Sequence, residues 1–421
     1  MTAIWTPANA STHSKLPVIV FTTGGGDQTG GINIPTQLPS DLVHNTGLIV
    51  ITINYRVNIM GFPNARGLNN TNFALQDQRA AVEWVVENIE SFGGDPAQVT
   101  LWGQSAGSGL SDMYLFAYPD NPLIRASISS SATALGYPSK NFDYAGTNFT
   151  FVAKAMGCDF EDAALELQCM RQVPMPRLIN FIGHYQDNST LVNTSQPTLN
   201  FGRQGKLGHA ESREPLLIVL SRLADDKYVF TDAQYLAKYA KGDLAKVPKM
   251  IGTTAREGAP LLPWPANNVS GGPPLQSIIA TTLNAFVCPS YNTSLQRDKA
   301  GLTTYRYEWA GNFSNIDGGV TWLGAYHYSD LYMFFGTYPI APGPIPEFEV
   351  ETSRTMQNLL SDFVRYPECL PRHGWPDYHP LAANGGELVR FGADGKTVQI
   401  VSGDSVAGAC HIPDATYNTT P

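Results

Sequence analysis

The stretch that decides the fold is Val99-Thr100-Leu101-Trp102-Gly103-Gln104-Ser105-Ala106-Gly107-Ser108. Its first four residues are apolar, β-branched or aromatic and follow the polar turn Gly94-Asp95-Pro96, so they predict a short buried strand. The pattern Gly-x-Ser-x-Gly follows at once, and a helix is expected over 108–117. A serine on a tight strand-to-helix turn between two glycines is typical of a nucleophile elbow. A plain glycine-rich turn after a strand is the alternative interpretation.

Three adjacent glycines, Gly24, Gly25 and Gly26, follow another predicted strand over 16–21. Without side chains, this backbone can approach a reacting group closely. Its N–H groups, with that of the residue after the serine, would form an oxyanion hole. A phosphate-binding loop is disfavoured because no Gly-Lys-Ser/Thr is present, and a flexible turn is the remaining alternative.

Strands and helices alternate along the rest of the chain. Strands are expected over 48–55, 126–131, 245–254 and 303–309, helices over 75–89 and 353–363, and a closing hairpin over 388–401. This order predicts a parallel α/β sheet within a single domain, 1–421. Residues from about 140 to 245 are polar and mostly helical, so we interpret them as an insertion or cap over the edge where substrates enter.

Composition excludes several classes of protein. The chain has 421 residues, of which 43% are hydrophobic and 15% charged, as in a globular protein with a large core. The net charge of −9 and the absence of a Lys/Arg run argue against a nucleic-acid partner. No apolar run is long enough for a transmembrane segment.

Several features favour a secreted glycoprotein. Asn-x-Ser/Thr sites, about twice the number expected by chance, occur at Asn9, Asn69, Asn148, Asn188, Asn193, Asn268, Asn292, Asn312 and Asn418. Five cysteines would allow one or two disulfides. No signal peptide is recognisable at Met1, so we expect that it was lost with the true N-terminus. A surface that is merely rich in Asn and Thr is the alternative explanation of these Asn-x-Ser/Thr sites.

An elbow serine needs a base and an acid, and in this strand-turn-helix architecture they follow the serine in the order acid, then histidine. Glu257 comes just after the predicted strand 245–254, and His327 lies on a later loop. Each also has an ordinary explanation, Glu257 as a surface acid and His327 as one of eight histidines with a purely structural role.

Motifs spread along most of the chain resemble those of one protein family. In chain order they are Asn54-Tyr-Arg56, Gly61-Phe62, Asp77-Gln-Arg79, Glu83-Trp84-Val85, Phe92-Gly-Gly-Asp-Pro96, Gly103-Gln-Ser-Ala-Gly107, Arg256-Glu257-Gly258 and Gly324-Ala-Tyr-His327. Together they resemble the type-B carboxylesterase/lipase family, which includes cholinesterases, over roughly residues 5–391, and most closely its fungal branch. The resemblance implies an α/β-hydrolase fold, with a central, mostly parallel twisted sheet flanked by helices and with helical cap insertions.

The resemblance also implies roles for individual residues. Ser105 would be the nucleophile, His327 the general base and then acid, and Glu257 the residue that orients the imidazole. The N–H groups of Gly25, Gly26 and Ala106 would form the oxyanion hole. Ser131 and Gly24 would lie just behind the reacting groups.

Further implied features are structural. Arg56 and Asp95 would form a buried ion pair, and Cys158 with Cys169 a disulfide. A second disulfide between Cys288 and Cys410 is implied as well, which leaves Cys369 unpaired.

The chain also departs from the family pattern. The family's N-terminal segment, with its first strands, is expected to be missing before Trp5-Thr6-Pro7. Thr23 replaces the usual His or Tyr before the glycines, and Asp27 replaces an aromatic residue after them. A carboxylate in the hole would repel the oxyanion, so we predict that Asp27 turns to solvent. Ser131-Ala132 in place of Ser-Gly is a milder change.

The predicted function is hydrolysis of small-molecule or lipid carboxylic esters through an acyl-enzyme, without a metal or an organic cofactor. The alternative is a catalytically impaired or inactive truncated member of the family, which serves as a binding protein or does not fold stably. The sequence indicates neither the ester substrate nor the oligomeric state.

Overall fold

A nine-stranded sheet forms the centre of the protein. The computed structural model describes residues 1–136, 146–187, 224–263 and 269–419. The strand order across the sheet is β1-β3-β2-β4-β5-β6-β7-β8-β9. The strands are β1 Thr2–Trp5, β2 Leu16–Thr22, β3 Ile49–Ile53, β4 Gly94–Gln104, β5 Ala126–Ser130, β6 Lys249–Thr254, β7 Thr304–Trp309, β8 Glu387–Ala393 and β9 Lys396–Ser402.

The six pairs from β3 to β8 are parallel, and only the edge strands β1 and β9 run antiparallel to their neighbours. All five residues of β3 and all six of β7 are buried, as expected for parallel strands covered on both faces. β2 and β4 are in register with Thr22 opposite Gly103. The loops that follow these two strands therefore lie side by side.

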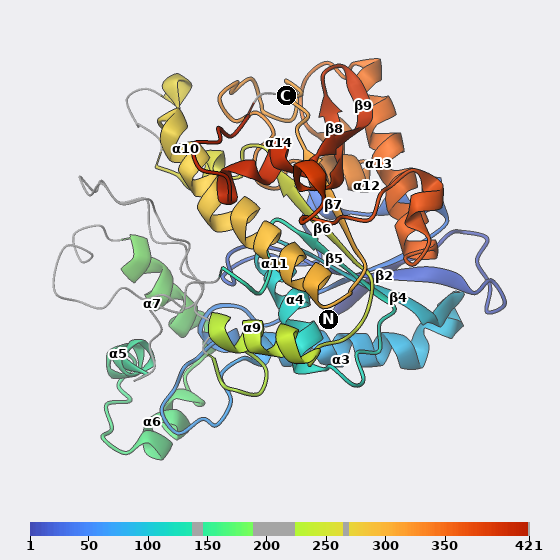
Figure 1. The fold of residues 1–421 in the computed structure, drawn as a ribbon. Helices are drawn as coiled ribbons and strands as arrows, with labels where there is room; N and C mark the ends of the chain where they lie inside the picture. The colour runs from blue at the N-terminus through green and yellow to red at the C-terminus, as the bar shows by residue number, and fades with distance from the viewer. Residues whose placement is uncertain (137–145, 188–223, 264–268, 420–421) are drawn as a thin grey trace.

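Helices cover both faces of the sheet (Figure 1). They are α1 Ser40–Thr46, α2 Asn58–Gly61, α3 Phe73–Asn88, α4 Ala106–Ala117, α5 Thr147–Ala155, α6 Ala163–Met170, α7 Met175–Asp187, α9 Asp232–Lys241, α10 Leu275–Thr282, α11 Cys288–Lys299, α12 Asp330–Phe335, α13 Glu347–Arg365 and α14 Gly403–Ala407. One hydrophobic core joins the sheet to α3, α4 and α9, and a second joins it to α1, α12 and α13. The parallel sheet with a layer of helices on each face confirms the predicted α/β-hydrolase fold.

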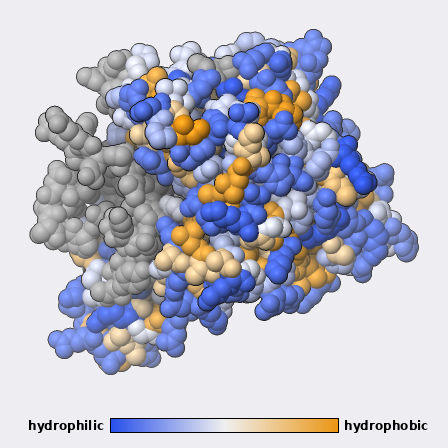
Figure 2. Space-filling model, viewed as in Figure 1, coloured by the Kyte–Doolittle hydropathy of each residue, from blue (hydrophilic) through white to orange (hydrophobic). Residues whose placement is uncertain are grey.

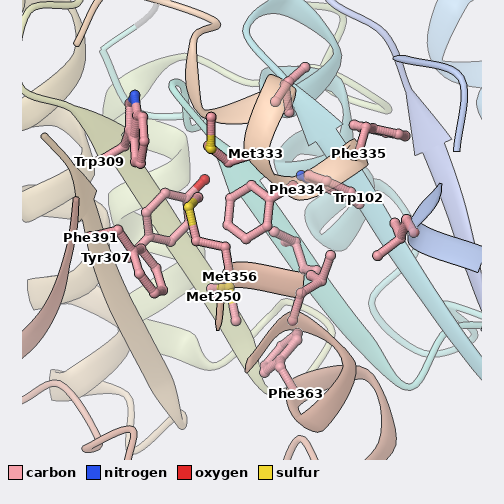
Figure 3. Packing of buried hydrophobic residues seen from close by; sticks show 14 of the residues in the cluster. Trp102, Met250, Tyr307, Trp309, Met333, Phe334, Phe335, Met356, Phe363 and Phe391 are labelled. Carbon is pink, nitrogen blue, oxygen red and sulfur yellow. The ribbon is translucent and has the colours of Figure 1, made fainter. Parts of the chain in front are cut away.

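The second core is rich in aromatic side chains. Figure 3 shows Trp102 of β4 beside Phe334 and Phe335 of α12. The ring centroids of Trp102 and Phe335 are 5.2 Å apart with nearly parallel planes, and Phe334 meets Trp102 edge-on at 5.6 Å. Because α12 begins three residues after His327, this packing fixes the C-terminal end of the loop that carries the histidine.

The region predicted as a cap is helical where it is described. Helices α5, α6 and α7 enclose a small hydrophobic cluster of their own, and they project to one side of the sheet in Figure 1. A disulfide joins Cys158 to Cys169 within this cluster. Helix α9 instead packs on α4, where Tyr235 and Tyr239 contact Phe116. Residues 137–145 and 188–223 of the predicted cap lie outside the described residues.

The second predicted disulfide is present as well. It joins Cys288, the first residue of α11, to Cys410 near the C-terminus, and Cys369 is free and exposed. The face shown in Figure 2 is mostly hydrophilic with small, scattered apolar patches. Among the described helices, none is both long and apolar enough to cross a membrane.

One predicted ion pair is wrong. Arg56 does not meet Asp95; its half-exposed guanidinium instead forms two hydrogen bonds with Asp77 of α3, at 2.7 and 2.8 Å. Asp95 accepts hydrogen bonds from Gln98 and from the Ala97 N–H. The reason is topological, because Arg56 follows the C-terminal end of β3 whereas Asp95 lies at the N-terminal end of the parallel strand β4.

Candidate active site

Ser105 lies on a sharp turn between β4 and α4. Its φ of 54° and ψ of −124° are unfavourable for a residue with a side chain, and such strain is typical of functional positions. A Cβ at Gly103 would lie 2.1 Å from the Gly107 carbonyl oxygen, and a Cβ at Gly107 would lie 2.2 Å from that of Thr22. Only glycine fits at both positions, so the turn requires the pattern seen in the sequence.

Ser105, His327 and Glu257, predicted from separate parts of the chain, lie in contact. Ser105 Oγ is 2.8 Å from His327 Nε2, and His327 Nδ1 is 2.5 Å from Glu257 Oε2. Glu257 is fully buried and His327 is 9% exposed. The three groups therefore form a continuous hydrogen-bonded chain that ends at the cavity described below.

Backbone contacts fix Glu257 relative to the histidine loop. Thr254 at the end of β6 donates its N–H to Glu257 Oε1 at 2.8 Å. The neighbouring Arg256 N–H donates to the Ala325 carbonyl at 2.9 Å, two residues before His327. The carboxylate and the imidazole are thus held by directly paired segments.

Two side chains that the sequence analysis did not single out contact the imidazole. Gln104 Nε2 is 3.3 Å from His327 Nε2, and the Phe286 ring centroid is 5.0 Å from that of the imidazole. Gln104 could have been found, because it directly precedes Ser105. Phe286 lies in a π-helical turn, Leu283–Val287, between α10 and α11, and no pattern in the sequence indicates its position.

The three-glycine loop lies against the nucleophile. A Cβ at Gly24 would come within 2.4 Å of Gln104 Oε1 and 2.8 Å of Ser105 Cβ. Gly25 and Gly26 have positive φ values of 118° and 62°, and within the described residues their N–H groups donate no backbone hydrogen bond. Ala106 is the first residue of α4, so its N–H lies at the positive end of that helix.

The prediction for Asp27 is wrong. Its side chain is fully buried and does not turn to solvent. Asn58 donates its N–H to the Asp27 carbonyl at 2.7 Å, and Gln28 and Thr29 donate theirs to the Gly25 carbonyl. These bonds hold Asp27 at a φ of 61° with its side chain inside the protein. Asp27 is also absent from the described lining of the cavity, so its burial brings no carboxylate to that surface.

A buried polar network lies behind the triad. Trp102 Nε1 donates to Ser130 Oγ, Ser130 Oγ is 2.9 Å from Tyr307 Oη, and Tyr307 Oη lies 2.9 Å from Asp330 Oδ2. Burial, and then the nearby charge of Glu257, raise the pKa of Asp330 to about 7. The sequence analysis did not identify Asp330 as a titrating group, because its burial depends on the fold.

Ser131 is fully buried beside this region. Its N–H donates to the Gly252 carbonyl at 2.8 Å, and its hydroxyl has no hydrogen-bond partner among the described residues. Its φ of 61° is again unfavourable for a side-chain-bearing residue. Its expected role behind the triad acid stays a prediction.

A cavity of about 1290 Å³ opens onto the triad. Its described lining is Thr23, Gly24, Gly25, Gly26, Gln28, Thr29, Gly30, Gly31, Ile32, Asn33, Ile34, Gln37, Asn54, Tyr55, Gln104, Ser105, Pro260, Leu261, His327 and Tyr328. Within the described ranges, no group of three or more His, Cys, Asp or Glu side chains is arranged to hold a metal ion.

Comparison with known proteins finds similarity to esterases and lipases. Residues 2–278 match the sequence profile of the carboxylesterase family. Secreted lipase 5 of Gibberella zeae is 36% identical over 411 residues, which cover 94% of this chain and 71% of the lipase. The chlorogenic acid esterase of Aspergillus niger is 34% identical, over 97% of this chain and 76% of that enzyme. The liver carboxylesterase of Sus scrofa is 26% identical, over 96% and 75% of the two chains.

Proposed function

The chain belongs to the carboxylesterase family, and we propose that it hydrolyses carboxylic esters with Ser105 as the nucleophile. The observation that carries the proposal is the hydrogen-bonded chain from Ser105 Oγ through His327 to Glu257, with distances of 2.8 and 2.5 Å. Serine hydroxyls are weak nucleophiles, and a neighbouring imidazole overcomes this by removing the proton as the bond to carbon forms.

In the first half of the reaction, Ser105 Oγ attacks the ester carbonyl carbon while His327 Nε2 takes the hydroxyl proton. The carbonyl oxygen becomes an anion, which the N–H groups of Gly25, Gly26 and Ala106 stabilise. His327 then gives its proton to the leaving alcohol oxygen, and the carbon–oxygen bond of the ester breaks. Glu257 keeps the imidazole oriented and stabilises its cationic form.

The second half repeats these steps with water. His327 takes a proton from the water molecule, whose oxygen attacks the acyl carbon. The second tetrahedral anion forms at the same N–H groups, and the proton then passes to Ser105 Oγ as the acid leaves. Neither half of the cycle requires a metal ion or an organic cofactor.

Labelling with a fluorophosphonate tests this assignment directly, because the reagent phosphonylates only a serine that an adjacent base activates. We expect one adduct, on the peptide that contains Ser105. Ser105→Ala and His327→Ala should abolish it, and Ser91→Ala, at an exposed serine of the described surface, should label as the wild type does. A folded protein that does not label would support the alternative of an inactive binding protein.

We also propose that the protein is secreted and glycosylated. Four of the described acceptor asparagines, Asn9, Asn69, Asn312 and Asn418, are exposed, whereas Asn148 is buried and is an unsuitable acceptor. Expression through a eukaryotic secretory pathway should give a product whose mass falls on treatment with an N-glycosidase. An unchanged mass would contradict glycosylation.

A further inference from the structure

The imidazole of His327 exchanges one of its hydrogen bonds during the proposed reaction. Nε2 is bound to Ser105 Oγ before the attack and must then reach the oxygen of the leaving alcohol, while Nδ1 stays bound to Glu257. Because the bond at Nε2 is lost and remade, another contact has to keep the ring in place. An apolar contact suits this task, since it is independent of the oxygen that Nε2 binds.

Phe286 makes such a contact. Its ring centroid is 5.0 Å from that of the imidazole, the two planes are inclined at 46°, and the side chain is 4% exposed. Centroid separations of about 4.5–7 Å are typical of packed aromatic rings. Phe286 is absent from the described lining of the cavity. Its ring therefore packs on the imidazole and not on the surface against which an ester would lie.

A π-helical turn carries Phe286 to this position. The turn, Leu283–Val287, joins α10 to α11, and the residues at both of its ends keep a helical conformation. Single π turns within helices are rare and are frequent at functional sites. Val287, the next residue, packs instead in a cluster with Tyr291 and Ala407. The turn thus directs Phe286 alone of these two side chains to the triad.

The helix before this turn also contacts the loop of the triad acid. Gly258, directly after Glu257, donates its N–H to Thr282 Oγ1 at 3.0 Å, and the Thr282 hydroxyl donates to the Ile278 carbonyl at 2.8 Å. A Cβ at Gly258 would lie 2.6 Å from that carbonyl oxygen, so glycine is required for this close approach. The acid and the imidazole are therefore both placed by one continuous helical segment.

The helix after the turn is fixed to the rest of the protein. Its first residue, Cys288, is joined to Cys410, and Thr293 donates its hydroxyl proton to Thr133 Oγ1 at 2.8 Å. A side chain on a segment that is held at both ends can restrain a neighbouring ring without moving itself.

We propose that Phe286 is a positioning residue for ester hydrolysis. Its ring keeps the imidazole of His327 in the orientation that serves Ser105 Oγ first and the leaving oxygen second. This inference rests on the proposed function, and it concerns the second proton transfer most, because the imidazole no longer has its hydrogen bond to Ser105 at that step.

Two esters of the same acid separate the two proton transfers. Butyl butanoate needs a proton on its leaving alkoxide, whereas p-nitrophenolate is a stable anion that leaves p-nitrophenyl butanoate without one. The value of kcat/KM covers only the steps up to release of the alcohol, so hydrolysis of the shared butanoyl-enzyme does not affect it. The alkyl-to-aryl ratio of kcat/KM is measured for the wild type and for Phe286→Leu. A loss of folded protein lowers both values equally and leaves this ratio unchanged.

We expect the alkyl-to-aryl ratio to fall by about three- to thirtyfold in Phe286→Leu, because a displaced imidazole protonates the alkoxide poorly. Phe149→Leu is the matched control, at an equally buried phenylalanine in the separate cluster of α5, α6 and α7, and it should keep the wild-type ratio. Should Phe286→Leu fail to fold, Phe286→Met also removes the ring, fills the space with a flexible side chain and must lower the same ratio.

An unchanged ratio in a folded Phe286 variant would overturn the proposal, even if the variant were less stable or less active on both esters. Failure of the proposed function has a different signature, because ester turnover by the wild type would then be absent or would persist in Ser105→Ala. Turnover that depends on Ser105, with a ratio that does not respond to Phe286, would refute only the positioning role.

Discussion

Gly103 and Gly107 show how single residues decide the shape of the active site. Each lies where two backbone segments approach so closely that even a methyl group would overlap a carbonyl oxygen. Ser105 can therefore take its strained conformation only between two residues without side chains. The Gly-x-Ser-x-Gly pattern is thus explained by sterics and not only by resemblance.

Gly107→Ala should destabilise the protein by about 3 kcal/mol or more, because the clash involves main-chain atoms that no side-chain rotation relieves. Gly183→Ala is the matched control. Gly183 lies in α7 with nothing within 4 Å of an added Cβ, and this substitution should stabilise the helix by about 0.5–1 kcal/mol. Denaturant unfolding of both variants and the wild type measures the effects. A Gly107→Ala variant as stable as the wild type would contradict the steric explanation.

The raised pKa of Asp330 predicts how the stability of the fold depends on pH. Its pKa is raised from 3.8 to about 7, chiefly by burial, so the folded state binds this proton more tightly than the unfolded state does. The contribution of Asp330 to stability is therefore greatest below about pH 4 and falls as the pH rises through about 7. Asp330→Asn removes this dependence while keeping an oxygen that can accept from Tyr307.

The loss of unfolding free energy between about pH 5 and about pH 8 should be smaller in Asp330→Asn than in the wild type by about 1–3 kcal/mol. Urea titrations at both pH values measure it. Asp394→Asn, at an exposed carboxylate of the β8–β9 turn, should preserve the wild-type difference. Asp330 would not be the titrating group if its variant behaved as Asp394→Asn does.

Sequence reasoning was strongest where chemistry restricts the residue type. Ser105, Glu257 and His327 were predicted from the elbow pattern, the chain order and the resemblance, and the structure brings them into contact. The two errors, the Arg56–Asp95 pair and the exposure of Asp27, both concern where a side chain points. That depends on the topology of β3 and β4 and on the loop hydrogen bonds at Asn58 and Gly25, which no local pattern encodes.

At the scale of elements, the strands were predictable and their exact ends were not. The expected strand over 16–21 appears as Leu16–Thr22, and that over 303–309 as Thr304–Trp309. Strand β4, by contrast, begins five residues earlier than expected, at Gly94, because Gly94 pairs with Leu16 of β2 before a register shift brings Val99 opposite Val18. Such tertiary pairing overrides local turn propensity.

The disulfide between Cys288 and Cys410 joins elements that are distant in sequence. It closes a loop with a sequence separation of 122 residues, and it anchors α11 directly after the turn that places Phe286 against His327. Cross-links across long loops restrict the unfolded chain most strongly.

Replacing both Cys288 and Cys410 by alanine should lower the free energy of unfolding by about 2–4 kcal/mol. Cys369→Ala, at the free and exposed cysteine, should change it by less than about 0.5 kcal/mol. Chemical denaturation of the three proteins without reductant measures both effects. A double variant as stable as the wild type would show that this link contributes nothing to stability.

At the scale of the whole molecule, the sheet serves to bring separate loops together. The loop after β2 supplies the three glycines, the turn after β4 supplies Ser105, and the segments after β6 and β7 supply Glu257 and His327. These strands run parallel, so their C-terminal ends lie along one edge of the sheet, where ligands of α/β proteins bind. The family and the fold could be predicted because the motifs mark these strand ends.

The most direct test of the account is the hydrolysis of p-nitrophenyl esters from short to long acyl chains by the wild type, Ser105→Ala and Ser91→Ala. The account predicts turnover by the wild type and by Ser91→Ala, and a fall in kcat/KM of about 10⁴-fold or more in Ser105→Ala. The acyl length that gives the fastest turnover would also separate esterase from lipase preference. Equal turnover by Ser105→Ala and the wild type would contradict the central claim that Ser105 is the nucleophile.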